Sequence, residues 1–190
     1  MILSLLRTRR CVAALEFALL SPIFVLVFAA VVDLGNALYT WSKLEQALAL
    51  GANYALINTA SVTASNQTNQ TLANSIATMV ATSNPGHGAD ATVVVNNGTT
   101  ATVTGTASGA GSPSDSGTAS NAQSYYCLTG SPANWAWGTG YANNTTACTD
   151  GSQAGQFVTI AVSYTFTPFF PAYHFITNNT MTDGAVVQTN

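Results

Sequence analysis

An unbroken apolar run near the N-terminus limits what this chain can fold into more than any other feature. Residues 12–32 read VAALEFALLSPIFVLVFAAVV, and Glu16 is the one charged residue among them. As an α-helix these 21 residues extend about 31 Å at 1.5 Å per residue, which matches the hydrocarbon core of a bilayer. Because backbone polar groups inside a bilayer must bond to one another, the run predicts a single membrane-spanning helix.

The charges on either side of this run predict its orientation. Arg7, Arg9 and Arg10 precede it, and Lys43 is the fourth and last basic residue of the chain. The positive-inside rule therefore places residues 1–11 in the cytoplasm and nearly everything after the run outside. The run is too long for a cleaved secretory signal, and no A-x-A-like cleavage site follows it, so we expect a retained anchor. Four basic residues also leave no basic patch for binding nucleic acid.

The helical pattern continues beyond the span. Apolar or small residues recur at spacings of three and four, which predicts one continuous helix over residues 12–57. We expect the face that they form to pack on the chain's own domain or, in part, on a neighbouring subunit. Tyr39 and Trp41 also suit the headgroup region of a membrane. The face consists of Ala37, Trp41, Leu44, Leu48, Gly51 and Ala55.

Pro22 lies inside the span and lacks the N–H that helical bonding needs, so the sequence predicts a kink there. In lipid, Ser21 or a neighbouring helix would bond to the carbonyl left free. These segments divide the chain into a basic leader (1–11), a transmembrane helix (12–34), a helix extension (35–60) and an extracytoplasmic domain (61–190).

The domain after the helix changes from helical to strand patterns. Residues 67–82 predict a second helix, capped by Asn66 or Ser65, and residues 105–121 have the composition of a loop. The fold class is therefore α+β, with a long helix packed on a small antiparallel sheet. Strands are expected at 91–96, 99–104, 122–128, 156–166 and 180–188.

Asn97-Gly98 is the strongest short hairpin signal in the chain. A two-residue turn at this position fixes the register of the strands on either side. In this register Asn96 pairs with Thr99, Val94 with Ala101 and Thr92 with Val103. We expect the side chains of these pairs to face the helix.

Two of the three cysteines lie in the exported part. Cys127 and Cys148 are expected to form a disulfide that closes the loop 127–148, whereas Cys11 lies on the reducing side. The loop carries an aromatic cluster, which is either a contact surface for a partner subunit or glycan, or a small core that folds the loop onto the sheet. The cluster consists of Trp135, Trp137 and Tyr141.

The sequence contains no constellation that would support catalysis. It has no G-x-S-x-G motif and no phosphate-binding loop, and its two histidines lack metal-ligand spacing. We therefore expect no enzymatic activity, no metal and no cofactor.

The first 40 residues resemble a known family. The run from Arg9 to Leu19 (RRCVAALEFAL), followed by Ser21-Pro22 and Asp33-Leu34-Gly35, resembles the start of TadE-like proteins. These are pilin-related components of the bacterial tight-adherence, or Flp-type, pilus machinery. Residues 157–168 resemble, more weakly, a late strand of the family. The resemblance implies a pilin-like subunit of the inner membrane, with its domain in the periplasm or on a filament and with other pilus proteins as partners.

The resemblance also implies a processing site. Prepilin peptidase cuts type IV pilin-like proteins before a segment with Glu at its fifth position. Glu16, followed by Phe17, is fifth if Val12 is first, so the cut would fall after Cys11, where Gly is usual. The ammonium of Val12 on one subunit would then pair with Glu16 of another, or else Glu16 reaches back to the cytoplasmic interface near Arg9.

Two other functions fit the sequence. One is a membrane-anchored adhesin or binding module that uses the aromatic loop. The other is a permanent periplasmic scaffold of the secretion machinery.

Overall fold

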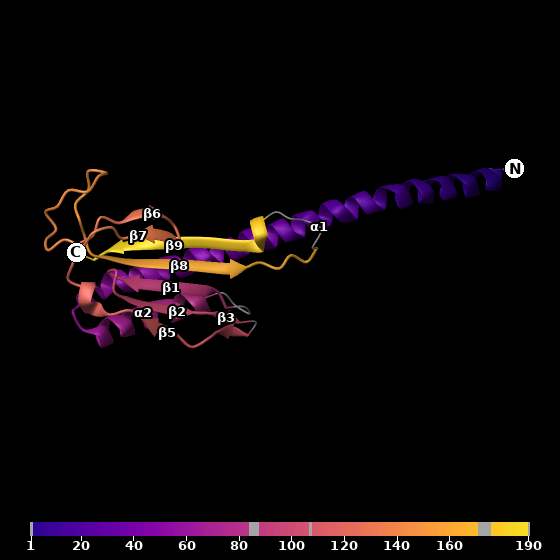
Figure 1. The fold of residues 1–190 in the computed structure, drawn as a ribbon. Coiled ribbons are helices and arrows are strands. Elements are labelled where there is room, and N and C mark those ends of the chain that lie inside the picture. Colours follow the sequence, from indigo (N-terminus) through magenta and orange to yellow (C-terminus); the bar gives the residue numbers. More distant parts are fainter. Residues whose placement is uncertain (1, 84–87, 107, 171–175, 190) are drawn as a thin grey trace.

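The computed structural model describes residues 2–83, 88–106, 108–170 and 176–189; for residues 2–13 and 177 it describes the backbone alone. One helix, α1 (Ile2–Ile57), dominates the shape (Figure 1). Its N-terminal half projects from the rest of the protein, and its C-terminal half lies along a sheet. We call the sheet domain the part made of α1 from Asp33 onward, α2 (Asn66–Thr82) and the strands.

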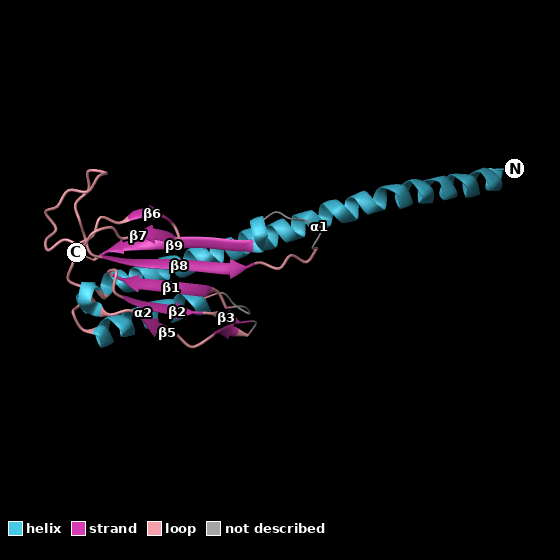
Figure 2. Ribbon diagram, in the orientation of Figure 1, coloured by secondary structure: helices cyan, strands magenta, loops and turns pink. Residues whose placement is uncertain are grey.

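The sheet has five antiparallel strands in the order β5-β2-β1-β8-β9. Both helices lie on one face of it (Figure 2). Two short hairpins, β3–β4 and β6–β7, stand outside this sheet. The strands are β1 (Asp90–Val95), β2 (Thr99–Val103), β3 (Gly105–Thr106), β4 (Gly109–Ala110), β5 (Ser114–Ser116), β6 (Thr129–Ser131), β7 (Asn134–Ala136), β8 (Phe157–Thr165) and β9 (Thr180–Gln188). Three short 3-10 helices are η1 (Thr59–Ser61), η2 (Ala119–Asn121) and η3 (Thr177–Asn179).

The predicted α+β architecture is confirmed, and the core lies between the helices and the sheet. Alternate residues of the strands turn toward the helices, as the period of two requires. The helix α2 begins at the predicted cap, where the Ser65 hydroxyl accepts from the Thr68 N–H. The centre of the core is formed by Leu44, Ile76, Val80, Val93, Val95, Val158, Ile160 and Val162.

The packing face of α1 differs from the predicted face at one position. Ala37, Leu44, Leu48, Gly51 and Ala55 are buried as expected. Trp41 is 40% exposed, so its assignment to this face was wrong. Its indole N–H donates to Glu45 one turn further along the outer surface, and the smaller Thr40 is buried in its place.

The β1–β2 hairpin closes one residue away from the predicted register. The buried stripe therefore contains Val93 and Val95, and not Thr92 and Val94. A shift of one residue moves every side chain of β1 to the other face of the sheet, because the side-chain period is two, whereas Ala101 and Val103 of β2 keep the predicted buried face. The observed pairs are Ala91 with Val103, Thr92 with Thr102, Val93 with Ala101, Val94 with Thr100 and Val95 with Thr99.

The turn explains this shift. The left-handed positions are Asn96 (φ 45°) and Asn97 (φ 53°), and the Gly98 N–H closes the turn on the Val95 carbonyl. Asn tolerates this conformation because its short side chain bonds locally or to nearby backbone. Here the Asn96 side chain is fully buried and binds the loop 121–124. Asn96 therefore belongs to the turn, and β1 ends one residue earlier than predicted.

The loop regions were predicted less well. The segment 105–121, expected to be a loop, contains β3, β4, η2 and the edge strand β5. The strand expected at 122–128 is absent; Tyr125 and Tyr126 make only isolated bridges, to Tyr141 and Gly155. The hairpin β6–β7 was not predicted, whereas β8 and β9 lie within the predicted ranges 156–166 and 180–188.

The disulfide between Cys127 and Cys148 is present. It closes a segment that lies at the end of the sheet away from the projecting part of α1 (Figure 1). Bonds from Tyr126 to Gly155 and from Gln156 to Ala122 tie the same region to the start of β8. The region is thus held by covalent and polar links more than by a large core.

Gly51 sets how closely α1 approaches the rest of the core. A Cβ at this position would lie 2.8 Å from Val80 Cγ2 and 3.3 Å from Ile160 Cδ1. We expect Gly51→Val to lower the free energy of unfolding by about 2–3 kcal/mol through overpacking. The measurement is chemical denaturation of the full chain in detergent, followed by near-UV circular dichroism. Gly35→Val is the matched control, because nothing lies within 4 Å of a Cβ there; equal losses for the two variants would contradict the prediction.

Candidate functional site: the projecting helix and its junction with the sheet domain

Most side chains in the projecting part of α1 from Ala14 to Val32 are apolar and exposed. Phe17, Phe24 and Phe28 are each about 70% exposed. α1 is the one helix in the described part of the chain that is long and apolar enough to cross a membrane, with a mean hydropathy of 2.5 and 6% of its most apolar window buried. A helix that is apolar all round requires lipid or other helices around it. The other large exposed side chains on this surface are Leu15, Leu19, Leu20, Ile23, Val25, Leu26, Val27, Val31 and Val32.

The residues of the predicted processing site lie in one uninterrupted stretch of α1. The helix runs through Cys11, Val12, Glu16 and Phe17 without a break. Glu16 and Phe17 are exposed. The side chains of Cys11, Val12 and Arg9 lie outside the described residues, so cleavage and both expected partners of Glu16 stay predictions.

Pro22 interrupts the hydrogen bonding of α1 without ending the helix. Because proline has no N–H, the carbonyl of Ala18 has no partner one turn later. The Ser21 hydroxyl donates to this carbonyl at 3.4 Å. The sequence assigned this role to Ser21 or to a neighbouring helix, and Ser21 performs it here.

Asp33 joins α1 to the sheet domain. Its side chain is fully buried at the point where the exposed apolar surface of the helix meets the fold. One carboxylate oxygen accepts from the Phe169 N–H at 2.8 Å, and the other accepts from the Phe170 N–H at 2.9 Å. Hydrogen bonds to a carboxylate are among the stronger ones in proteins. Sequence reasoning used Asp33 only as part of the resemblance, and missed this junction.

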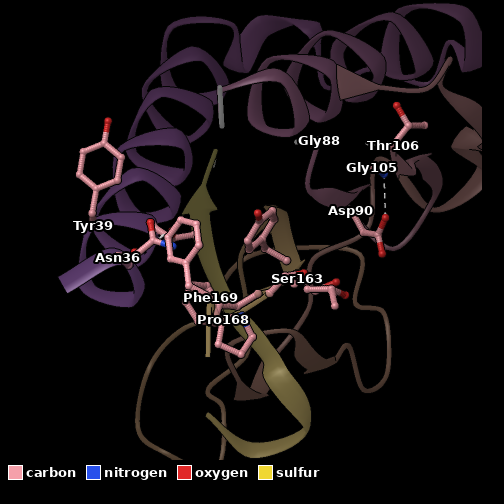
Figure 3. Close-up of a pocket in the computed structure, with 14 residues that line it drawn as sticks. Asn36, Tyr39, Gly88, Asp90, Gly105, Thr106, Ser163, Pro168 and Phe169 are labelled. Carbon is pink, nitrogen blue, oxygen red and sulfur yellow. Dashed lines mark hydrogen bonds between the residues drawn. The ribbon is translucent and has the colours of Figure 1, made fainter. Parts of the chain in front are cut away.

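A groove of about 680 Å³ opens beside this junction. Asn36 and Tyr39 of α1 border it, together with Pro168 and Phe169 of the loop after β8 (Figure 3). Asp90, whose carboxylate accepts from the Gly105 N–H at 2.8 Å, lies toward its other side. Hydroxyl and amide groups provide most of its polar lining. The groove therefore offers hydrogen bonding but little charge.

The aromatic residues of the disulfide loop are all half-buried. Trp137 packs edge to face on the buried Tyr126, with the ring centroids 5.6 Å apart. Trp135 lies in β7, and Tyr141 bridges to Tyr125. These contacts fold the loop against its surroundings, and a role of the same residues as a contact surface stays a prediction.

Chemistry-bearing residues are scattered over the described part of the chain. No group of three or more His, Cys, Asp or Glu residues there is placed to hold a metal ion. Hydrogen bonds from Ser152, first from its side chain and then from its backbone, hold the pKa of the exposed Asp150 carboxyl below its ordinary value.

Comparison with known proteins locates the family signal in the helix. The family model "TadE-like protein" matches residues 12–53, as the resemblance of the N-terminal residues predicted. The match covers most of α1, including Glu16, Asp33 and Gly51, and ends before α2. No curated protein and no solved structure matches the chain.

Proposed function

We propose that this chain is a minor pilin-like subunit of a bacterial tight-adherence pilus, stored in the inner membrane by α1 before assembly. The observation that carries the proposal is a helix with the TadE-like signature whose residues from Ala14 to Val32 are mostly apolar and exposed. Such a surface suits two successive environments, lipid during storage and the helices of other subunits after assembly.

The two halves of α1 divide this work. The exposed half supplies the surface that moves from lipid to neighbouring helices. The half from Asp33 onward is fixed to the rest of the sheet domain through Asp33 and Gly51, so any displacement of the helix carries the whole domain with it. The domain then faces outward as a lateral contact surface. Assembly of this kind implies other pilus subunits as partners and prepilin peptidase as the processing enzyme.

Processing is tested by mass spectrometry of the native N-terminus. A mature protein that begins at Val12 is the expected result, because Glu16 then takes the fifth position. A protein that keeps residues 1–11 and occurs only in the inner membrane would contradict the subunit proposal. That outcome would favour the permanent scaffold.

Glu16 provides the second test. In a filament without water around the helices, its carboxylate needs a cationic partner, and the free amine of Val12 on the next subunit supplies one. We expect Glu16→Gln to reduce the amount of protein in sheared filaments at least tenfold while the amount in the membrane stays the same. Glu45→Gln is the matched control, because Glu45 lies on the same helix and its Gln replacement still accepts from Trp41. Equal incorporation of both variants would contradict the role of Glu16.

A further inference from the structure

Two phenylalanines stand apart from the other apolar residues of the sheet domain. Phe169 is 69% exposed and Phe170 is 42% exposed. Among the described residues, every other large hydrophobic side chain that is exposed belongs to α1. Exposed aromatic pairs of this kind need an explanation, because soluble surfaces rarely leave them uncovered.

The position of the pair along α1 is fixed. Both backbone N–H groups bind the buried carboxylate of Asp33, so the rings lie at the level of the helix where the exposed apolar run ends. At that level α1 also exposes Leu34, Leu38 and Tyr39. The two rings therefore extend the apolar surface of the helix sideways from its outer end.

The backbone at this point suits an environment with little water. A polar backbone group that enters the edge of a bilayer must keep a hydrogen-bond partner. The N–H groups of Phe169 and Phe170 both have one in Asp33, and Pro168 has no N–H to satisfy. The negative charge of Asp33 is covered at the same time, since its side chain is fully buried.

We propose that Phe169 and Phe170 enter the outer interface of the same bilayer that α1 crosses and form a second membrane contact. Continuity with the exposed apolar surface of α1 identifies the occupant as lipid. A single helix leaves a domain free to tilt about its anchor, whereas two contacts at the same depth restrict that tilt. Phe169 and Phe170 thereby orient the sheet domain on the membrane.

The inference rests on α1 spanning a bilayer, and one experiment tests both points. The full chain carrying Cys11→Ser is placed in nanodiscs of phosphatidylethanolamine and phosphatidylglycerol, one copy per disc. A polarity-sensitive nitrobenzoxadiazole label is attached at Phe169→Cys or Phe170→Cys, and quenching by lipids with a nitroxide on acyl carbon 5 is measured. The substitutions leave the backbone bonds to Asp33 intact.

Two further label positions serve as controls. Val27→Cys lies in the exposed apolar run of α1, and Ser131→Cys lies exposed in β6. With the nitroxide on acyl carbon 5, we expect the labels at 169 and 170 to be quenched at least twofold more than the label at 131. A second set of discs carries the nitroxide on acyl carbon 12, deeper in the bilayer, and there we expect the label at 27 to be quenched most. If the label at 27 is quenched but the labels at 169 and 170 are quenched no more than the label at 131, the second membrane contact is overturned while the membrane-spanning role of α1 stands.

A comparison of these discs with discs that hold two copies separates lipid from a second copy of the chain. If the label at 27 is not quenched, the membrane-spanning role of α1 fails and the second contact fails with it. If the labels at 169 and 170 report an apolar environment only in discs that hold two copies, and lipid nitroxides do not quench them there, a second copy of the chain covers the phenylalanines. The assignment to lipid is then wrong.

Discussion

Replacing Asp33 by alanine is expected to lower the free energy of unfolding of the sheet domain by about 2–4 kcal/mol. The substitution removes both acceptors of the Phe169 and Phe170 N–H groups, which are bound at 2.8 and 2.9 Å. Both N–H groups form part-buried bonds, and a donor left without a partner away from water costs about 1–3 kcal/mol. Thermal unfolding of the full chain in detergent, followed by near-UV circular dichroism, measures the loss.

Hydrogen exchange gives the same prediction a local readout. The amides of Phe169 and Phe170 should exchange near the unprotected rate in the variant, because their local hydrogen bonds are gone, while the amides of β1 and β8 exchange faster only by the factor that the lowered free energy of unfolding sets. Asp115→Ala is the matched control, because Asp115 is an exposed carboxylate whose side chain accepts from Asn74 at 3.1 Å. Its removal should change stability by less than about 0.5 kcal/mol. If Asp33→Ala behaves like Asp115→Ala, the junction does not hold the loop.

The sequence predicted those parts of the fold whose signals are local. The apolar run 12–32, the spacing of Leu44, Leu48 and Gly51, and the cap at Ser65 each lie within a few turns of one helix. Trp41 was misplaced because residues 40 and 41 lie almost equally close to the packing face. In the structure the Trp41 indole N–H donates to the Glu45 carboxylate on the outer surface, and the smaller Thr40 is buried instead.

The parts that failed depend on distant contacts. At the hairpin turn, Asn96 binds carbonyls 25 to 28 residues away, and these contacts are not visible in the local sequence. The Asp33 junction joins residues 136 and 137 positions apart. A sequence pattern shows that Asp33 follows an apolar run, but it does not show which backbone amides will reach it. The apolar character of Phe169 and Phe170 was visible, whereas their exposure required the fold.

The largest loss of stability is expected for Asn96→Asp. The Asn96 side chain is fully buried, and its Oδ1 accepts from the Phe157 N–H at 3.2 Å. Its amide nitrogen donates to three backbone carbonyls, those of Asn121 at 3.2 Å and of Ala122 and Ser124 at 2.8 Å each. Aspartate has nearly the same shape but turns this donor into a negatively charged acceptor that faces the three carbonyl oxygens.

We expect the variant to lose more than about 4 kcal/mol at neutral pH, because a buried, unpaired charge is among the most destabilising changes known. The loss should shrink as the pH falls. Burial beside carbonyl oxygens favours the neutral carboxyl, so the pKa of the new side chain is higher in the folded than in the unfolded state. The folded state then binds more protons between the two pKa values, and stability relative to the parent chain decreases as pH rises through that window.

Asn97→Asp isolates the cause. Asn97 also lies in the left-handed region of the same turn, but it is half-exposed, and the contact that it makes with Asn121 uses its backbone carbonyl, which the substitution keeps. The same change in charge should therefore have a small effect with little dependence on pH. Denaturant unfolding of both variants between pH 4 and 8 checks the pair. Similar losses would mean that the turn conformation and net charge, and not the buried amide, determine the register of the hairpin.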